Sequence, residues 1–191
     1  YFKAMDKAVS TTDLATLKAY LAWNVINAAA PYLNKAMVDA DFNFFGKVLS
    51  GKEENQPRWK RVVDVVNGSL GEVVGKLYVE KYFPASAKER MVKLVENVKV
   101  SLNERINAGE WMQPETKEKA VAKLNTMRVK IGYPEEWRDY SNLSIEKDSY
   151  YANVLRARRF ENDYQLAKIG KPGDPSEWLM TPHTVNAYYN P

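Results

Sequence analysis

The amino-acid sequence predicts an all-α protein, an irregular multi-helix bundle that ends in a short orphan β-strand. Three observations predict this class. Apolar residues recur at steps of three and four from residue 12 to residue 170, which is the spacing of one helix face. Proline, glycine and polar turns divide this region into segments of unequal length, with no fixed repeat. Only residues 184–189 combine the β-branched and aromatic composition of a strand.

The composition limits the classes of protein to consider. With 191 residues and 45% hydrophobic content, the chain can bury a core of its own. The net charge of +4 is small and the charges are interspersed, which argues against nucleic-acid binding. The absence of Cys excludes disulfides, thiolate metal sites and cysteine nucleophiles. No apolar run reaches the ~18 residues of a membrane span. The start at Tyr1, with neither Met nor a signal-peptide core, suggests a processed chain or an excised fragment.

The first expected helix begins near residue 12. Thr12 is the predicted N-cap, and Asp13 is favourable at the positive end of the helix. Pro31 restarts or kinks the helix, and an apolar surface continues to Gly46 before the polar loop 50–56. One apolar face of this helix comprises Leu14, Leu17, Leu21, Val25 and Ala28.

The next expected helix starts at Pro57 and has the clearest apolar stripe in the chain. Gly68, Gly71 and Gly75 lie inside it, and each costs the helix up to ~1 kcal/mol relative to Ala. Their spacing places them on a shared face, which indicates that another backbone approaches closely there. A merely weak helix is the alternative. The stripe comprises Trp59, Val62, Val63, Val66, Leu70, Val73, Val74 and Leu77.

Three further helices are expected before the C-terminal segment. Residues 86–89 have the form of a capping box at the start of a helix that ends at 107–109. Pro114 opens another helix, which the sequence 132–134 stops. The last helix is expected over 148–168.

The C-terminal stretch 178–191 is the least helical part of the chain. Residues 170–175 form strong turn punctuation before it. A strand over 184–189 needs a sheet to join, and no second strand is predicted before it. An extended tail packed on helices remains open as the alternative. The expected division is a helical domain at 1–177 and the start of a second domain at 178–191.

The residues themselves predict no catalytic or metal site. His183 is the only His, which excludes a two-histidine zinc motif within the chain, and its polar surroundings predict a solvated ring. The carboxylate pairs 53–54 and 135–136 lie in polar connectors, without the burial that would tune them for catalysis. No glycine-rich phosphate loop follows a strand.

Six phrases nevertheless occur in a characteristic order and at compatible spacing. Together they resemble the neprilysin family of zinc metallopeptidases, which includes endothelin-converting enzymes and bacterial oligopeptidases. Val62 and Val63 stand where eukaryotic members carry Cys, which suggests a bacterial member. The phrases are YLAW at 20–23, QPRWKR at 56–61, GKLYV at 75–79, WMQPETK at 111–117 with Ala120, IGYP at 131–134 and VNAYY at 185–189.

The resemblance implies a division of labour in a longer enzyme that cleaves oligopeptides. Residues 1–177 would be the central helical portion, which encloses the substrate cavity, and 178–191 would begin the edge strand of the catalytic domain. Asn186 would bond the substrate backbone through its side-chain amide and Ala187 through its carbonyl. Tyr188 joins them as a substrate-binding candidate, although its ring is expected mainly to pack the strand.

The same resemblance places zinc in the whole enzyme and not in this chain. The family's HExxH motif follows VNAYY, and the chain stops before it, so we expect this piece to be inactive and to bind no metal. Its partners would be an oligopeptide and the catalytic domain of the same polypeptide. An extracytoplasmic bacterial location is expected. The alternatives are a stand-alone helical peptide-binding or interaction domain without enzymatic activity, and a purely structural helical domain.

Overall fold

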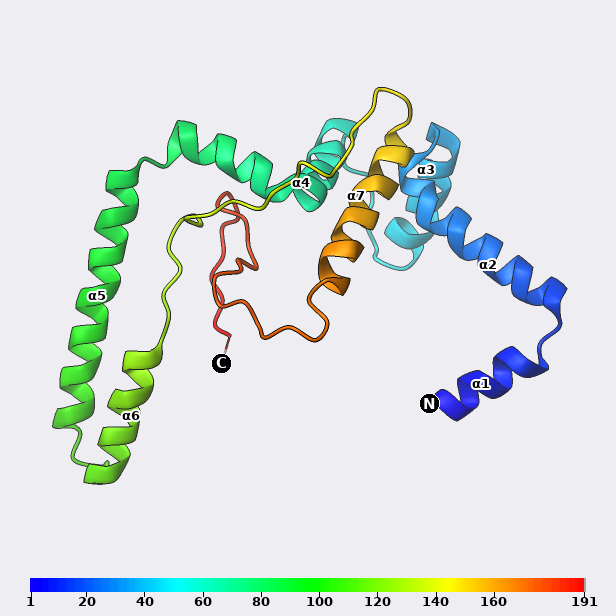
Figure 1. Cartoon of the computed structure of the whole chain (residues 1–191). Helices are drawn as coiled ribbons and strands as arrows, with labels where there is room; N and C mark the ends of the chain where they lie inside the picture. The colour runs from blue at the N-terminus through cyan, green and yellow to red at the C-terminus, as the bar shows by residue number, and fades with distance from the viewer. Residues whose placement is uncertain (191) are drawn as a thin grey trace. The chain divides into compact units, whose positions relative to one another are not determined.

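The computed structural model describes residues 1–190, and Pro191 at the end of the expected strand lies outside them (Figure 1). The regular structure of the described residues is helical throughout, which confirms the all-α class. The elements are α1 (Phe2–Thr11), α2 (Leu14–Ala29), the 3₁₀-helix η1 (Ala30–Tyr32), α3 (Lys35–Asp41), the π-helix η2 (Phe42–Val48), α4 (Arg58–Tyr82), α5 (Ala85–Ala108), α6 (Pro114–Thr126) and α7 (Tyr150–Leu166).

The chain divides into two compact units. The first comprises residues 1–65 and 141–165, and the second comprises 66–140 and the residues from 166 onward. In the first unit the ring of Tyr32 lies 5.8 Å from that of Tyr150 and 6.2 Å from that of Tyr151. The guanidinium of Arg158 covers Tyr32 at 5.2 Å and donates to its hydroxyl at 3.0 Å. This aromatic cluster joins η1 to α7.

An ion pair stabilises the start of α7 in the first unit. Arg156 donates to both carboxylate oxygens of Asp148, at 2.6 and 3.1 Å. These bonds hold the pKa of Asp148 well below its ordinary value. Ser149 follows Asp148 directly, and its hydroxyl accepts from the backbone N–H of Ala152 at 3.3 Å. Ser149 therefore caps the N-terminus of α7, and the ion pair lies directly beside this cap.

In the second unit α5 and α6 form an antiparallel helical hairpin (Figure 1). Pro114 lies in the first turn of α6, as predicted, and Gly109 is the C-cap of α5. Lys117 Nζ on α6 donates to the carbonyl of Asn107 at the end of α5, at 2.7 Å. Leu124 of α6 is only 4% exposed.

Two of the predicted caps differ from the structure. The carboxylate of Asp13, not the hydroxyl of Thr12, accepts from the amide of Thr16 at 3.0 Å, because α2 begins one residue later than expected. The capping box at 86–89 does not form. Helix α5 already begins at Ala85 after Pro84, so Ser86 lies inside its first turn. The helix α1 was not predicted, and all its residues are exposed.

The core is smaller than the composition predicted. Many apolar side chains on helix faces stay accessible, such as Trp23 at 62% and Leu77 at 63% exposed, because no described element covers them. None of the described helices combines the length and apolar character needed to cross a bilayer. The buried hydrophobic residues of the described chain are Ala29, Ala30, Val38, Leu124, Val154 and Ala157.

Candidate functional site

The C-terminal segment, residues 178–190, lies against the glycine face of α4 in the second unit. A Cβ atom added at Gly71 would lie 2.6 Å from Thr181 Cγ2, and one at Gly75 would lie 2.6 Å from Pro182 Cδ. Both glycines are buried. A close approach does occur at these two positions, but the approaching atoms belong to side chains and not to the backbone that was predicted. We call these two contacts, Gly71 with Thr181 and Gly75 with Pro182, the glycine contact.

Gly68 does not take part in this contact. It is exposed, and a Cβ atom there would have no neighbour within 4 Å. The backbone of α4 is non-helical at Leu70, with φ −128° and ψ 32°. The kink separates Gly68 from the two glycines that the segment contacts.

His183 extends the same line of contacts along α4. Its ring centroid lies 6.2 Å from that of Tyr78, and its Nε2 lies 3.4 Å from Thr181 Oγ1. Its Nδ1 is buried and has no hydrogen-bond partner among the described residues. His183 is half-buried, so the expectation of a solvated ring holds only in part, because Tyr78 lies beside a ring that the local sequence leaves in polar surroundings. Positions 71, 75 and 78 share one helix face.

The connector after α6 supports α4 beside the segment. Trp137 Cζ3 lies 3.5 Å from the position of a Cβ at Gly75, and its ring stacks on Tyr133 at 6.3 Å. The backbone N–H of Arg138 donates to Glu72 Oε2 at 2.8 Å. The connector and the C-terminal segment therefore pack against neighbouring residues of α4, after its kink.

The start of the segment is fixed by charged side chains. Lys130 Nζ donates to the backbone carbonyl of Glu177, and Lys168 Nζ forms an ion pair with the carboxylate of the same residue. Glu177 precedes Trp178 directly. Lys130 and Lys168 therefore fix the position at which the segment begins to run along α4.

Residues 181–187 form local turns instead of the predicted strand. The amide of Thr184 donates to the carbonyl of Thr181 at 3.0 Å, and their hydroxyls lie 2.8 Å apart. The amide of Asn186 donates to the carbonyl of Thr184 at 3.1 Å. A strand needs a neighbouring strand to satisfy its backbone groups, and among the described residues there is none, so these donors bond locally.

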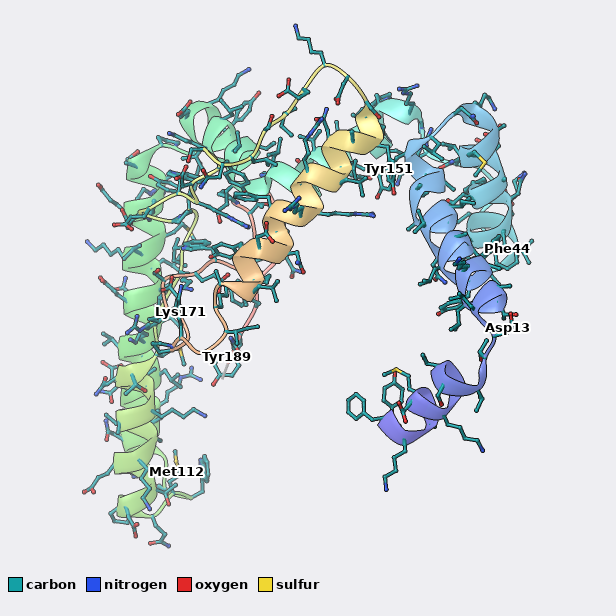
Figure 2. The ribbon with its side chains drawn as sticks, turned by 45° about the vertical axis from the view of Figure 1, so that its right-hand side comes forward. Asp13, Phe44, Met112, Tyr151, Lys171 and Tyr189 are labelled. Atoms are coloured by element: carbon teal, nitrogen blue, oxygen red, sulfur yellow. The ribbon has the colours of Figure 1, made fainter. Side chains whose placement is uncertain are left out.

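Asn186, Ala187 and Tyr188, the predicted substrate-binding residues, are all exposed. Asn186 Oδ1 accepts from the amide of Ala187 at 2.8 Å, and the Tyr188 hydroxyl accepts from the amide of Leu179 at 3.5 Å. The Asn186 side-chain nitrogen and the Ala187 carbonyl have no hydrogen bond among residues 1–190. Tyr189, marked in Figure 2, is 64% exposed. The segment therefore presents an adjacent donor and acceptor, the pair that an extended peptide backbone can bond.

Among the described residues, no group of three or more His, Cys, Asp or Glu side chains comes together to hold a metal. Of the carboxylates that the sequence singled out, Glu135 forms an ion pair with Lys88 at 2.5 Å. Asp41, whose pKa burial raises, belongs to the first unit. The polar groups that the segment leaves unbonded among the described residues include the Asn186 side-chain nitrogen and the Ala187 carbonyl.

Comparison with known proteins places these features in context. The profile of peptidase family M13 matches residues 1–134. The chain is 32% identical to the neutral endopeptidase of Lactobacillus helveticus, over 97% of this chain and 29% of that protein. It is 30% identical to neprilysin-11 of Caenorhabditis elegans, over 100% of this chain and 23% of that protein. The chain spans about a quarter of the length of these curated relatives.

Solved structures give the same relationship. The zinc metalloprotease Zmp1 of Mycobacterium tuberculosis in its open state has a TM-score of 0.87 with this chain. It is 44% identical over 94% of this chain and 28% of that one. The same enzyme in complex with an inhibitor has a TM-score of 0.82 at 44% identity, over 94% of this chain and 27% of that one. At this identity the similarity extends to sequence as well as fold.

Proposed function

The chain belongs to peptidase family M13, and from this membership we propose that it is the non-catalytic helical part of a zinc metalloendopeptidase that cleaves oligopeptides. The resemblance to neprilysin and to bacterial members is confirmed. In the proposed enzyme residues 1–177 enclose the substrate cavity, and 178–191 begin the edge strand of the catalytic domain. The observation that carries this proposal is the donor and acceptor that Asn186 and Ala187 present on a segment anchored to α4.

Substrate binding by this segment is strand addition. The Asn186 side-chain nitrogen donates to a carbonyl of the peptide, and the Ala187 carbonyl accepts from a peptide N–H. Such main-chain bonds hold peptides of many sequences, while specificity comes from side-chain pockets. The small side chain of Ala187 allows the substrate backbone to approach. Tyr188 packs beside them.

The segment must change its local bonds to act in this way. In a sheet the amides of Thr184 and Asn186 pair with a neighbouring strand instead of with carbonyls of their own segment. The catalytic domain of the same polypeptide is the proposed source of that strand. The hydroxyl contact between Thr181 and Thr184 can remain, since it uses no backbone group that the sheet needs.

Zinc belongs to the proposed whole enzyme, and we assign no ligand for it to this chain. The part played by these residues is to bind and orient the peptide, while hydrolysis requires groups that the described residues do not bring together. We therefore expect the purified chain to show no peptide hydrolysis and no stoichiometric tight binding of zinc. We also propose an extracytoplasmic location in a bacterium; the bacterial relatives support the bacterial source alone.

The substitution Asn186→Ala in the full-length enzyme tests this proposal. Loss of one buried hydrogen bond to substrate is worth about 1–3 kcal/mol, so kcat/KM should fall about 10- to 100-fold. Zinc content and melting temperature should not change. Unaltered kinetics would show that Asn186 does not contact the substrate, and a loss of zinc would indicate a structural role.

A further inference from the structure

The glycine contact joins the proposed peptide-binding segment to a rigid helix. Gly71 and Gly75 are buried, stand four residues apart and so lie on one face of α4. An alanine at either position would place its Cβ 2.6 Å from a carbon of Thr181 or Pro182. Carbon atoms without a shared bond pack at about 3.5–4.0 Å, so the segment moves by roughly 1 Å or, at position 71, the Thr181 side chain rotates and loses its hydroxyl contact with Thr184.

We propose that Gly71 and Gly75 are positioning residues for peptide binding, because they set how closely the segment that carries Asn186 and Ala187 packs on α4. This inference rests on the proposed function of the segment. Neither glycine touches the substrate itself. Each acts through the residue that it contacts, Thr181 or Pro182.

Helix chemistry alone does not explain glycine at these positions. Glycine is less favourable than alanine inside a helix, so the propensity of α4 would be improved by alanine at positions 68, 71 and 75 alike. Only Gly71 and Gly75 have a neighbour that the extra methyl group would meet. Close packing of the segment is therefore the feature that distinguishes these two from Gly68.

A short series of hydrogen bonds connects the glycine contact to the binding residues. Thr181 bonds Thr184 twice, through its carbonyl at 3.0 Å and through the hydroxyls at 2.8 Å. The carbonyl of Thr184 then accepts from the amide of Asn186 at 3.1 Å. When the segment pairs with a sheet, the hydroxyl contact between Thr181 and Thr184 is the one of these bonds that needs no exchange. This contact and the five residues of chain from Thr181 to Asn186 carry a displacement of Thr181 to the binding residues.

The expected consequence is weaker substrate binding with little change in the chemical step. The segment bonds the peptide backbone in the ground state and in the transition state alike, so its displacement should raise KM and leave kcat nearly unchanged. Displacements of about 1 Å are large compared with the tolerance of a hydrogen bond. We expect a rise in KM of about tenfold for Gly71→Ala or Gly75→Ala, with kcat within about twofold of the wild type.

The experiment uses the full-length enzyme and a fluorogenic oligopeptide. Gly68→Ala is the matched control, since it adds the same methyl group to the same helix without a neighbour. It should leave KM and kcat within about twofold of the wild type. Melting temperature and zinc content are measured for every variant.

A compensating substitution separates positioning from general damage. Thr181→Ser removes the Cγ2 atom that meets position 71 and keeps the hydroxyl that bonds Thr184. In the double variant Gly71→Ala/Thr181→Ser, KM should return to within about threefold of Thr181→Ser alone. A double variant that keeps the raised KM would overturn the proposal. So would a Gly71→Ala variant that fails to fold and is not restored by Thr181→Ser.

The outcomes also separate this inference from the function on which it rests. If Asn186→Ala lowers kcat/KM while Gly71→Ala and Gly75→Ala behave like Gly68→Ala, the segment binds peptide and the positioning role is refuted. If Asn186→Ala has no effect, the proposed binding function itself fails. A drop in kcat at constant KM for the glycine variants would likewise contradict positioning through ground-state binding.

Discussion

Gly132 allows a quantitative test of how the connector beside α4 is built. Its φ of +76° lies in the left-handed region, and an added Cβ would lie 2.2 Å from Phe83 Cε1 at the end of α4. The backbone conformation costs an alanine about 1–2 kcal/mol. Overpacking against the Phe83 ring costs about 1–3 kcal/mol more. Gly132→Ala should therefore destabilise the connector by about 2–5 kcal/mol.

Two other glycines separate the cost of the backbone conformation from the cost of overpacking. Gly170 has a φ of +77° but no neighbour within 4 Å, so Gly170→Ala should cost only the backbone term of about 1–2 kcal/mol. Gly173 has neither feature, and Gly173→Ala should be neutral or slightly stabilising because alanine reduces the freedom of the unfolded chain. The expected order of destabilisation is thus 132, then 170, then 173.

Hydrogen exchange measured by mass spectrometry on the full-length enzyme is the appropriate assay. A local loss of 2 kcal/mol speeds exchange about 30-fold, since each 1.4 kcal/mol is a factor of ten. For Gly132→Ala the increase should appear in peptides that cover 127–140. Equal effects of Gly132→Ala and Gly170→Ala would refute the packing contribution of Phe83, and no effect of either would refute the backbone argument.

Two further predictions concern stability. Leu124→Ala should destabilise the α5–α6 hairpin by about 2–5 kcal/mol, whereas Val98→Ala, at a position 57% exposed, should cost far less. Urea unfolding followed by circular dichroism measures the free energy of unfolding of both variants. Equal losses of stability would contradict the assignment of Leu124 to the core. The pKa of Asp148 is lowered in the folded state by the hydrogen bonds from Arg156, so this pair stabilises fully above the ordinary carboxyl pKa of about 4 and less as pH falls through the lowered value. Asp148→Asn should therefore lower the melting temperature at neutral pH and reduce the fall in melting temperature on acidification. Parallel curves of melting temperature against pH for the wild type and the variant would contradict a contribution of the ion pair to stability.

The helices were predictable because their apolar residues repeat at the helical period over long stretches, as from Trp59 to Leu77. Helix α1 was missed because it is short and buries none of its apolar positions. The π-helix η2 depends on bonds such as that from the Leu49 amide to the Phe44 carbonyl, at 3.0 Å, and an apolar pattern does not distinguish these from α-helical bonds. Element type was thus easier to predict than the local geometry of each end.

The site was predictable where backbone geometry constrains the residue type. The spacing of Gly71 and Gly75 predicted a close approach, although the same reasoning included Gly68 and expected a backbone instead of side chains. The partial burial of His183 was not predictable, because its neighbour Tyr78 is about a hundred residues away in the sequence. The strand over 184–189 depends on a partner strand that the described residues do not supply. Asn186, Ala187 and Tyr188 were identified only through the resemblance of VNAYY to the family.

The most direct test of the account is a structure of the full-length enzyme with a bound peptide-like inhibitor. The measurement is the pair of distances from Asn186 Nδ2 and the Ala187 carbonyl oxygen to the backbone of the inhibitor. We predict both within about 2.7–3.2 Å, with residues 184–189 extended at the edge of a sheet. An inhibitor bound elsewhere, or a segment that keeps the turns at Thr184 and Asn186 while the site is occupied, would contradict the claim that this chain supplies the peptide-binding strand.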